Sequence, residues 1–160
     1  MKDYIVMLAS VVGAFVLVTL LGQVSHSLVR VVNIFSLVVV YFAVEKGEVT
    51  GACLGAACGL LQDSFSLGVF GVAGIAKTVM GFLAGYSSAR VNILPLGRNF
   101  VFILILVTLE LIIWMGLTSV VFSEPVNFDN GLLFFQPLVT TILGAGCFAF
   151  LRKHLSPATG

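Results

Sequence analysis

Residues 51–74 read GACLGAACGLLQDSFSLGVFGVAG, and this stretch carries the features that decide the fold. Glycine recurs every four residues, at Gly51, Gly55 and Gly59, in an otherwise apolar run. Small residues at this spacing let two helices approach closely within a lipid bilayer. Asp63 continues the spacing, and an ionisable side chain inside an apolar segment is costly enough to require a specific role. The stretch therefore predicts a closely packed membrane helix that carries a carboxylate.

The composition of the whole chain predicts the same environment. Of its 160 residues, 59% are hydrophobic and only 9% are charged, whereas a soluble domain usually carries about 25% charged residues. The apolar residues form continuous runs, without the strict alternation of a membrane barrel strand. The sequence therefore predicts an all-α, polytopic membrane protein that forms one integral membrane domain over residues 1–160.

Six apolar runs are near the length of roughly 17–25 residues that crosses a bilayer. We expect helices at about 4–22, 28–44, 49–65, 69–89, 100–122 and 132–151. The first run is expected to be a retained helix, because no small-residue cleavage site of a signal peptide follows it. The connections between the runs are too short to hold a separate soluble domain.

The distribution of lysine and arginine predicts the orientation, because cytoplasmic loops carry an excess of both. If the chain starts in the cytoplasm, the outer loops carry Arg30 alone. The cytoplasmic ends then carry Lys2, Lys46, Arg90, Arg98, Arg152 and Lys153. We expect a multi-pass protein of the bacterial inner membrane with both termini in the cytoplasm.

Three charged residues lie within the predicted spans, at Asp63, Lys77 and Glu110. At about 1.5 Å per residue, Asp63 and Lys77 lie at nearly the same depth in neighbouring antiparallel helices. The sequence therefore predicts that they pair, with Gln62 as a polar neighbour. Glu110 lies near the midplane, and a contact with Lys77, a place in a polar cavity and a protonated state are the alternatives for it. Hydration near the boundary, substrate or ion binding, and contact with a partner's helices are alternative roles for these residues.

The glycines have two interpretations: they pack helices of this chain against each other, or they shape a groove for a partner's helix. In both, the fourth predicted helix takes part through its own glycine pair, and further glycines make the preceding turn compact. The candidate glycines are Gly51, Gly55, Gly59, Gly68, Gly71, Gly81 and Gly85.

Several function classes are disfavoured by the sequence. A net charge of +1 gives no electrostatic basis for nucleic-acid binding. The cysteines Cys53, Cys58 and Cys147 lie inside apolar runs and indicate packing rather than a disulfide or zinc site. Neither His26 nor His154 falls at membrane depth beside a carboxylate. We expect no enzymatic activity, no cofactor and no metal.

Residues 59–71, GLLQDSFSLGVFG, resemble the signature of the MreD family of bacterial rod shape-determining membrane proteins. The motif does not include Lys77 or Glu110. The resemblance implies a six-helix fold similar to the substrate-binding subunits of energy-coupling-factor transporters. It also implies a role in the cell-wall elongation complex and peptidoglycan synthesis. The implied partners are MreC directly and, through it, RodA, a penicillin-binding transpeptidase and MreB.

Two functions therefore follow from the sequence. The first is a non-enzymatic membrane scaffold or regulator that binds MreC, is surrounded by membrane lipid and helps maintain rod shape. The alternative is a small-molecule transporter or its substrate-binding subunit, in which the three charged residues would face a ligand cavity.

Overall fold

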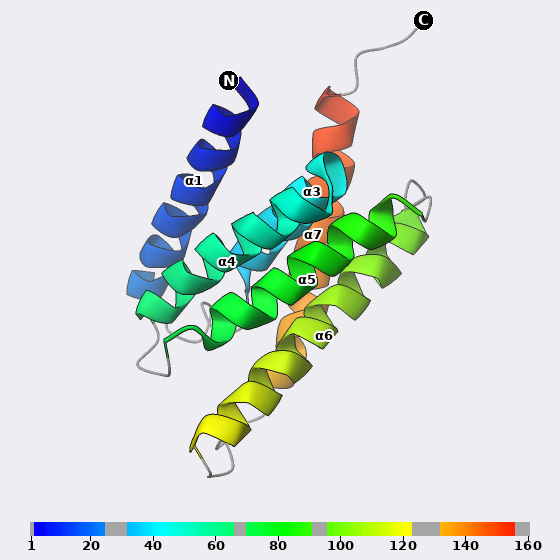
Figure 1. The fold of residues 1–160 in the computed structure, drawn as a ribbon. Coiled ribbons are helices and arrows are strands. Elements are labelled where there is room, and N and C mark those ends of the chain that lie inside the picture. The colour runs from blue at the N-terminus through cyan, green and yellow to red at the C-terminus, as the bar shows by residue number, and fades with distance from the viewer. Residues whose placement is uncertain (1, 25–31, 66–69, 91–95, 123–131, 156–160) are drawn as a thin grey trace, which may run out of the picture.

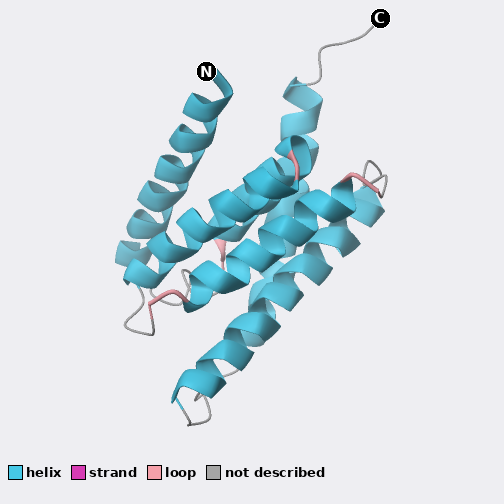
Figure 2. Ribbon diagram, viewed as in Figure 1, coloured by secondary structure: helices cyan, strands magenta, loops and turns pink. Residues whose placement is uncertain are grey.

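The computed structural model describes residues 2–24, 32–65, 70–90, 96–122 and 132–155. These ranges form helices and turns and contain no strand (Figure 2). The helices are α1 (Lys2–Val24), α3 (Ile34–Lys46), α4 (Glu48–Phe65), α5 (Val72–Ser88), α6 (Leu96–Phe122) and α7 (Leu132–Leu155). The predicted all-α class is confirmed at this level.

Successive helices run in alternating directions, so that α1 begins and α7 ends at the same end of the bundle (Figure 1). We call this the terminal end; the junction between α3 and α4 and the C-terminus of α5 also lie there. Helix α3 occupies the centre and contacts α1, α4, α5 and α7. Its side chains Phe35, Val39 and Val40 are buried in the apolar core. Helix α1 lies at the periphery and packs on α3.

Two stretches are long and apolar enough to cross a membrane, Tyr4–Gln23 in α1 and Gly97–Val121 in α6. Helix α3 differs from the predicted span, because Val32 and Asn33 are not helical and the helix begins at Ile34. Residues 28–31 lie outside the described residues. With 13 residues, α3 is roughly 20 Å long, which is shorter than the hydrocarbon core of about 30 Å.

The other helix limits differ from the predicted ones by smaller amounts. Helix α5 covers Val72–Ser88 rather than 69–89. Helix α6 begins one turn earlier than predicted, at Leu96, because the residues after Pro95 already have helical geometry. Helix α7 continues one turn further than predicted, to Leu155.

Helices α4 and α5 form the most extensive helix pair, and glycine makes their close approach possible. A Cβ atom at Gly51, Gly55 or Gly59 of α4 would come within 3.0 Å of backbone atoms of α5. A Cβ at Gly81 would meet Gly51 in the same way, and one at Gly85 would meet the backbone at the start of α4. At these five positions glycine packs helices of this chain against each other, which is the first of the two interpretations. The interhelical contact leaves no space for another helix there.

Candidate functional site

A network of buried polar side chains joins the middle of the bundle. Lys77 of α5 and Glu110 of α6 form an ion pair in which the lysine is fully buried and the glutamate is 5% exposed. Asn33 and Ser36, at the start of α3, lie against this pair and are also buried. The sequence indicates Lys77 and Glu110 as polar residues within the membrane. Of the alternatives for Glu110, the structure shows the contact with Lys77.

The ammonium group of Lys77 is saturated by acceptors from the chain. It donates to Oε1 of Glu110, to Oγ of Ser36 at 2.6 Å and to Oδ1 of Asn33 at 3.1 Å. An ammonium group has three N–H donors, so each donor is matched by an acceptor. The charge is therefore compensated without any group from outside the chain.

The carboxylate of Glu110 is matched in the same way. In addition to Lys77, Oε1 accepts from Nδ2 of Asn33 at 3.1 Å, and Oε2 accepts from Oγ of Ser36 at 2.5 Å. Both oxygens of the buried carboxylate therefore have donors. A buried charge is tolerated when it is paired and when its remaining lone pairs are hydrogen-bonded, and this network meets both conditions.

Asn33 connects the network to the start of α3 and to α7. Its Oδ1 accepts from the backbone N–H of Ser36 at 3.3 Å, which caps the helix, and its own N–H donates to Oγ1 of Thr140 at 3.2 Å. Asparagine is a preferred residue at a helix N-cap because its side chain satisfies a free N–H of the first turn. Asn33 and Ser36 are not among the residues predicted from the sequence, although an asparagine directly before an apolar run is the signal that indicates such a helix start.

Asp63 does not belong to this network, so the predicted pair of Asp63 and Lys77 is wrong. Its carboxylate, 4% exposed, accepts from the backbone N–H groups of Gly71 at 2.9 Å and of Ala73 and Gly74 at 3.2 Å each. These are free N–H groups at the N-terminus of α5, which attract a negative charge. Lys77 lies more than one turn further along α5 and reaches into the core instead.

The turn before α5 gives this carboxylate its donors. Gly71 has a φ of 101°, a backbone conformation that residues with a Cβ rarely adopt. A Cβ at Gly71 would meet nothing within 4 Å, so the position needs glycine for its backbone and not for helix packing. Gln62 is half-buried on α4, next to Asp63. Gly68, the other glycine predicted in this turn, lies outside the described residues.

Comparisons with known proteins leave the resemblance to MreD without independent support. No protein-family model matches the chain, and no curated protein or solved structure matches it. Membership of the family is therefore a proposal that rests on residues 59–71.

The geometry of the network favours holding helices together over chemistry on a substrate. It links α3, α5 and α6 through side chains and α7 through Thr140, and every donor of Lys77 is already used. Within the described part of the chain, no group of three or more histidine, cysteine, aspartate or glutamate residues could hold a metal ion. Cys53, Cys58 and Cys147 are free cysteines.

A shallow groove of about 380 Å³ lies on the outer side of the α4–α5 pair, separate from the network. Its walls are almost entirely apolar and include Ala56, Leu60, Gly74, Ile75 and Val79. Leu60, Ile75 and Val79 belong to the exposed apolar surface of the bundle. This groove borders the glycine contact, because Gly74, which a Cβ of Gly59 would meet, is part of its wall.

Proposed function

We propose that this chain is an integral membrane protein of the MreD family, with six helices in the bacterial inner membrane. It acts as a non-enzymatic scaffold or regulator of the cell-wall elongation complex and binds MreC. The observation that carries the proposal is the buried ion pair, because its charges are compensated entirely within the chain. A closed network of this kind stabilises a helix bundle and presents no reactive group.

The outer surface supports the location in a membrane. Large apolar side chains are exposed along most helices, and Leu8 in α1, Ile105 in α6 and Phe135 in α7 are each more than 60% exposed. A soluble monomer rarely exposes contiguous apolar patches of this kind. Lipid covers such side chains, and it also permits the peripheral position of α1.

The arrangement of the basic residues supports cytoplasmic termini. Lys46 and Arg90 lie at the ends of α3 and α5, and Arg98 lies in the first turn of α6, all at the terminal end of the bundle. A bias of lysine and arginine towards one end is the general signal of the cytoplasmic side. In this arrangement the turn that holds Asp63 faces the periplasm, where a partner such as MreC has its large part.

The experiment is co-purification from a rod-shaped bacterium that expresses the tagged native chain and MreC at comparable levels. We expect MreC to be recovered with the chain in a mild detergent, and RodA, the penicillin-binding transpeptidase and MreB to be recovered only when MreC is present. An unrelated membrane protein with the same tag is the control. Recovery of none of these proteins with the intact chain would overturn the proposal.

A second function, binding of a small molecule in the manner of a transporter subunit, is favoured by one observation. Helix α3 begins inside the bundle at the charged pair, and α7 contains Pro137 near the residue that contacts Asn33. A helix that begins at a polar centre inside the bundle, as α3 does, is typical of transporter substrate sites. A thermal-shift screen of small anionic and zwitterionic metabolites tests it, and specific stabilisation of the native chain by one of them would favour this function over the scaffold.

A further inference from the structure

We propose that Arg90 and Tyr86 form a binding site for the phosphate group of an anionic phospholipid at the terminal end of the bundle. The inference depends on the proposed membrane location but not on MreC as the partner. It assigns a ligand class to two residues of α5 and its C-terminal turn that neither the polar network nor the glycine contact uses.

Three side chains form a ladder along the outside of α5. Phe82, Tyr86 and Arg90 follow one another at the four-residue spacing that places side chains on one face of a helix. The rings of Phe82 and Tyr86 are stacked, with centroids 6.1 Å apart and an interplanar angle of 13°. The guanidinium carbon of Arg90 lies 4.2 Å from the centroid of the Tyr86 ring. At this distance the guanidinium group and the face of the ring attract each other.

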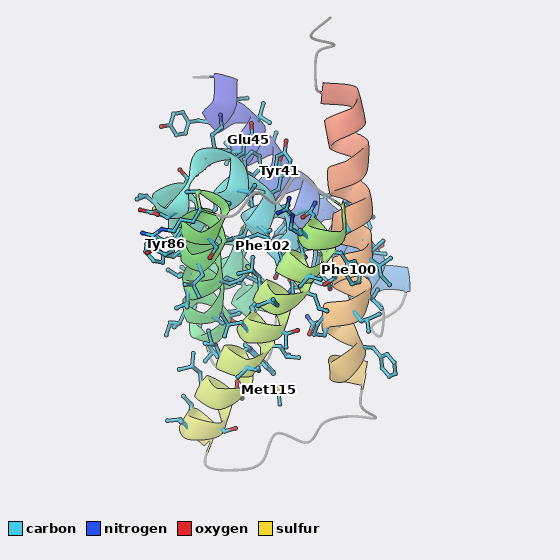
Figure 3. The ribbon with its side chains drawn as sticks, turned by 90° about the vertical axis from the view of Figure 1, so that its right-hand side faces the viewer. Tyr41, Glu45, Tyr86, Phe100, Phe102 and Met115 are labelled. Carbon is cyan, nitrogen blue, oxygen red and sulfur yellow. The ribbon has the colours of Figure 1, made fainter. Side chains whose placement is uncertain are left out.

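The ladder is accessible from outside the bundle. Phe82 and Tyr86 are 44% and 38% exposed, and Arg90 is exposed as well. Figure 3 shows Tyr86 on the outer side of α5. The ladder leads from the apolar middle of the helix towards its C-terminal end. Aromatic side chains of this kind are enriched at the level of the lipid headgroups.

No carboxylate in the described part of the chain neutralises Arg90. The sequence contains no aspartate or glutamate from Ser64 to Leu109. Asp63 is bound to the other end of α5, and Glu110 is paired with Lys77. Glu48 begins α4 beside Gly85, and Glu45 lies in the last turn of α3. The structure gives neither of these glutamates an ion pair with Arg90.

A guanidinium group that is stacked but not paired fits a phosphate group. Its N–H donors lie in one plane and match two phosphate oxygens at once. At the end of a membrane helix, the phosphate groups of the adjacent leaflet are present at high local concentration, and anionic lipids add a net attraction to basic residues. The neighbouring rings offer an apolar surface to the first part of the acyl chains.

The test uses the intact chain, purified in a neutral detergent and studied by native mass spectrometry with added lipid. We expect phosphatidylglycerol to be retained in preference to phosphatidylcholine. Arg90→Gln should reduce this retention by about five-fold, the amount expected for one basic residue at an anionic surface. Tyr86→Leu should reduce it less. Arg90→Lys should retain an amount between those of the native chain and Arg90→Gln, because lysine keeps the charge but lacks the planar guanidinium group that binds two oxygens at once.

Arg98→Gln is the matched control, because Arg98 is an exposed arginine at the same end of the bundle, in the first turn of α6. Retention that falls equally in Arg98→Gln and Arg90→Gln would overturn the proposal, since it would reflect general charge. Equal retention of the two lipids by the native chain would also overturn it. Inorganic phosphate is added as a competitor, and displacement of the lipid at millimolar phosphate would identify a free-phosphate site instead.

The failure of this inference is distinguishable from the failure of the proposed function. Arg90→Gln should still co-purify with MreC, because Arg90 contributes nothing to the core of the bundle. If the native chain retains phosphatidylglycerol through Arg90 but recovers no MreC, the scaffold function fails and the lipid site stands. A thermal unfolding measurement on each variant confirms that lost retention is not lost folding.

Discussion

At the scale of single residues, the buried ammonium group of Lys77 is the feature whose burial has to be compensated by other groups. A charge that is buried away from water without a partner costs several kcal/mol. Lys77 and Glu110 offset this cost together, and Asn33 and Ser36 supply the remaining hydrogen bonds. Removal of one member of the pair leaves the other charged and buried without compensation, which is more harmful than removal of both.

The first prediction is a double-mutant cycle on the ion pair, measured as thermal stability in detergent. Lys77→Met and Glu110→Gln should each destabilise by about 3–5 kcal/mol, because each leaves an unpaired buried charge. The double variant should lose clearly less than the sum of the two. Glu45→Gln, at an exposed glutamate at the end of α3, should change stability by less than about 0.5 kcal/mol.

A second cycle separates this pair from the one that the sequence suggests. Asp63→Asn should weaken the contact with the start of α5, where the aspartate accepts three backbone hydrogen bonds. Its coupling to Lys77→Met should be smaller than the coupling of Glu110→Gln to the same change, because the two residues share no hydrogen bond. A larger coupling for Asp63 would contradict the arrangement described above.

At the scale of helices, glycine determines how α4 and α5 approach each other. Backbone atoms of one helix occupy the space that a Cβ of the other would need, at Gly51, Gly55, Gly59, Gly81 and Gly85. This close approach brings the end of α4, with Asp63, against the start of α5. The same hairpin directs Lys77 towards α3 and α6. Glycine packing and the two polar contacts therefore depend on one another.

A third prediction concerns this helix contact. Gly55→Ala should destabilise by about 1–3 kcal/mol, because the new methyl group meets the backbone at Lys77 and Thr78 and the helices have to separate. Gly116→Ala is the control, since a Cβ there meets nothing within 4 Å and alanine is the better helix former by about 1 kcal/mol. Both are measured by thermal unfolding in the same detergent. Equal stability of the two variants would show that α4 and α5 are not in close contact.

At the scale of the whole molecule, the alternating helices place both ends of the described chain on one side. Helix α1 begins and α7 ends at the terminal end of the bundle, together with the basic ends of α3 and α5 (Figure 1). In a membrane, this arrangement requires an even number of crossings.

The fourth prediction is the position of the termini. Fusions of green fluorescent protein to either terminus should fluoresce, because the reporter folds in the cytoplasm. Alkaline phosphatase fused at the same positions should be inactive, and it should become active when it is inserted after α4, near Asp63. A fluorescent fusion at one terminus combined with an active phosphatase at the other would contradict the bundle topology.

The sequence by itself determines the class and the approximate helices of this protein. Runs of apolar residues and a low charge content dictate helices, and the four-residue glycine spacing indicates close packing around α4 and α5. It also indicates Asp63, Lys77 and Glu110 as the buried polar residues. These conclusions depend on local periodicity and composition, which can be read along the chain.

The tertiary structure alone decides which of these residues meet. Depth places Asp63 beside Lys77, but depth along two helices does not specify the direction in which each side chain points. The free N–H groups at the start of α5 take the carboxylate of Asp63. Lys77 pairs instead with Glu110, which is 33 residues away along the chain. It also donates hydrogen bonds to Asn33 and Ser36 at the start of α3. Pairing between distant helices depends on their rotation and on helix starts, and neither is encoded in the hydrophobic pattern.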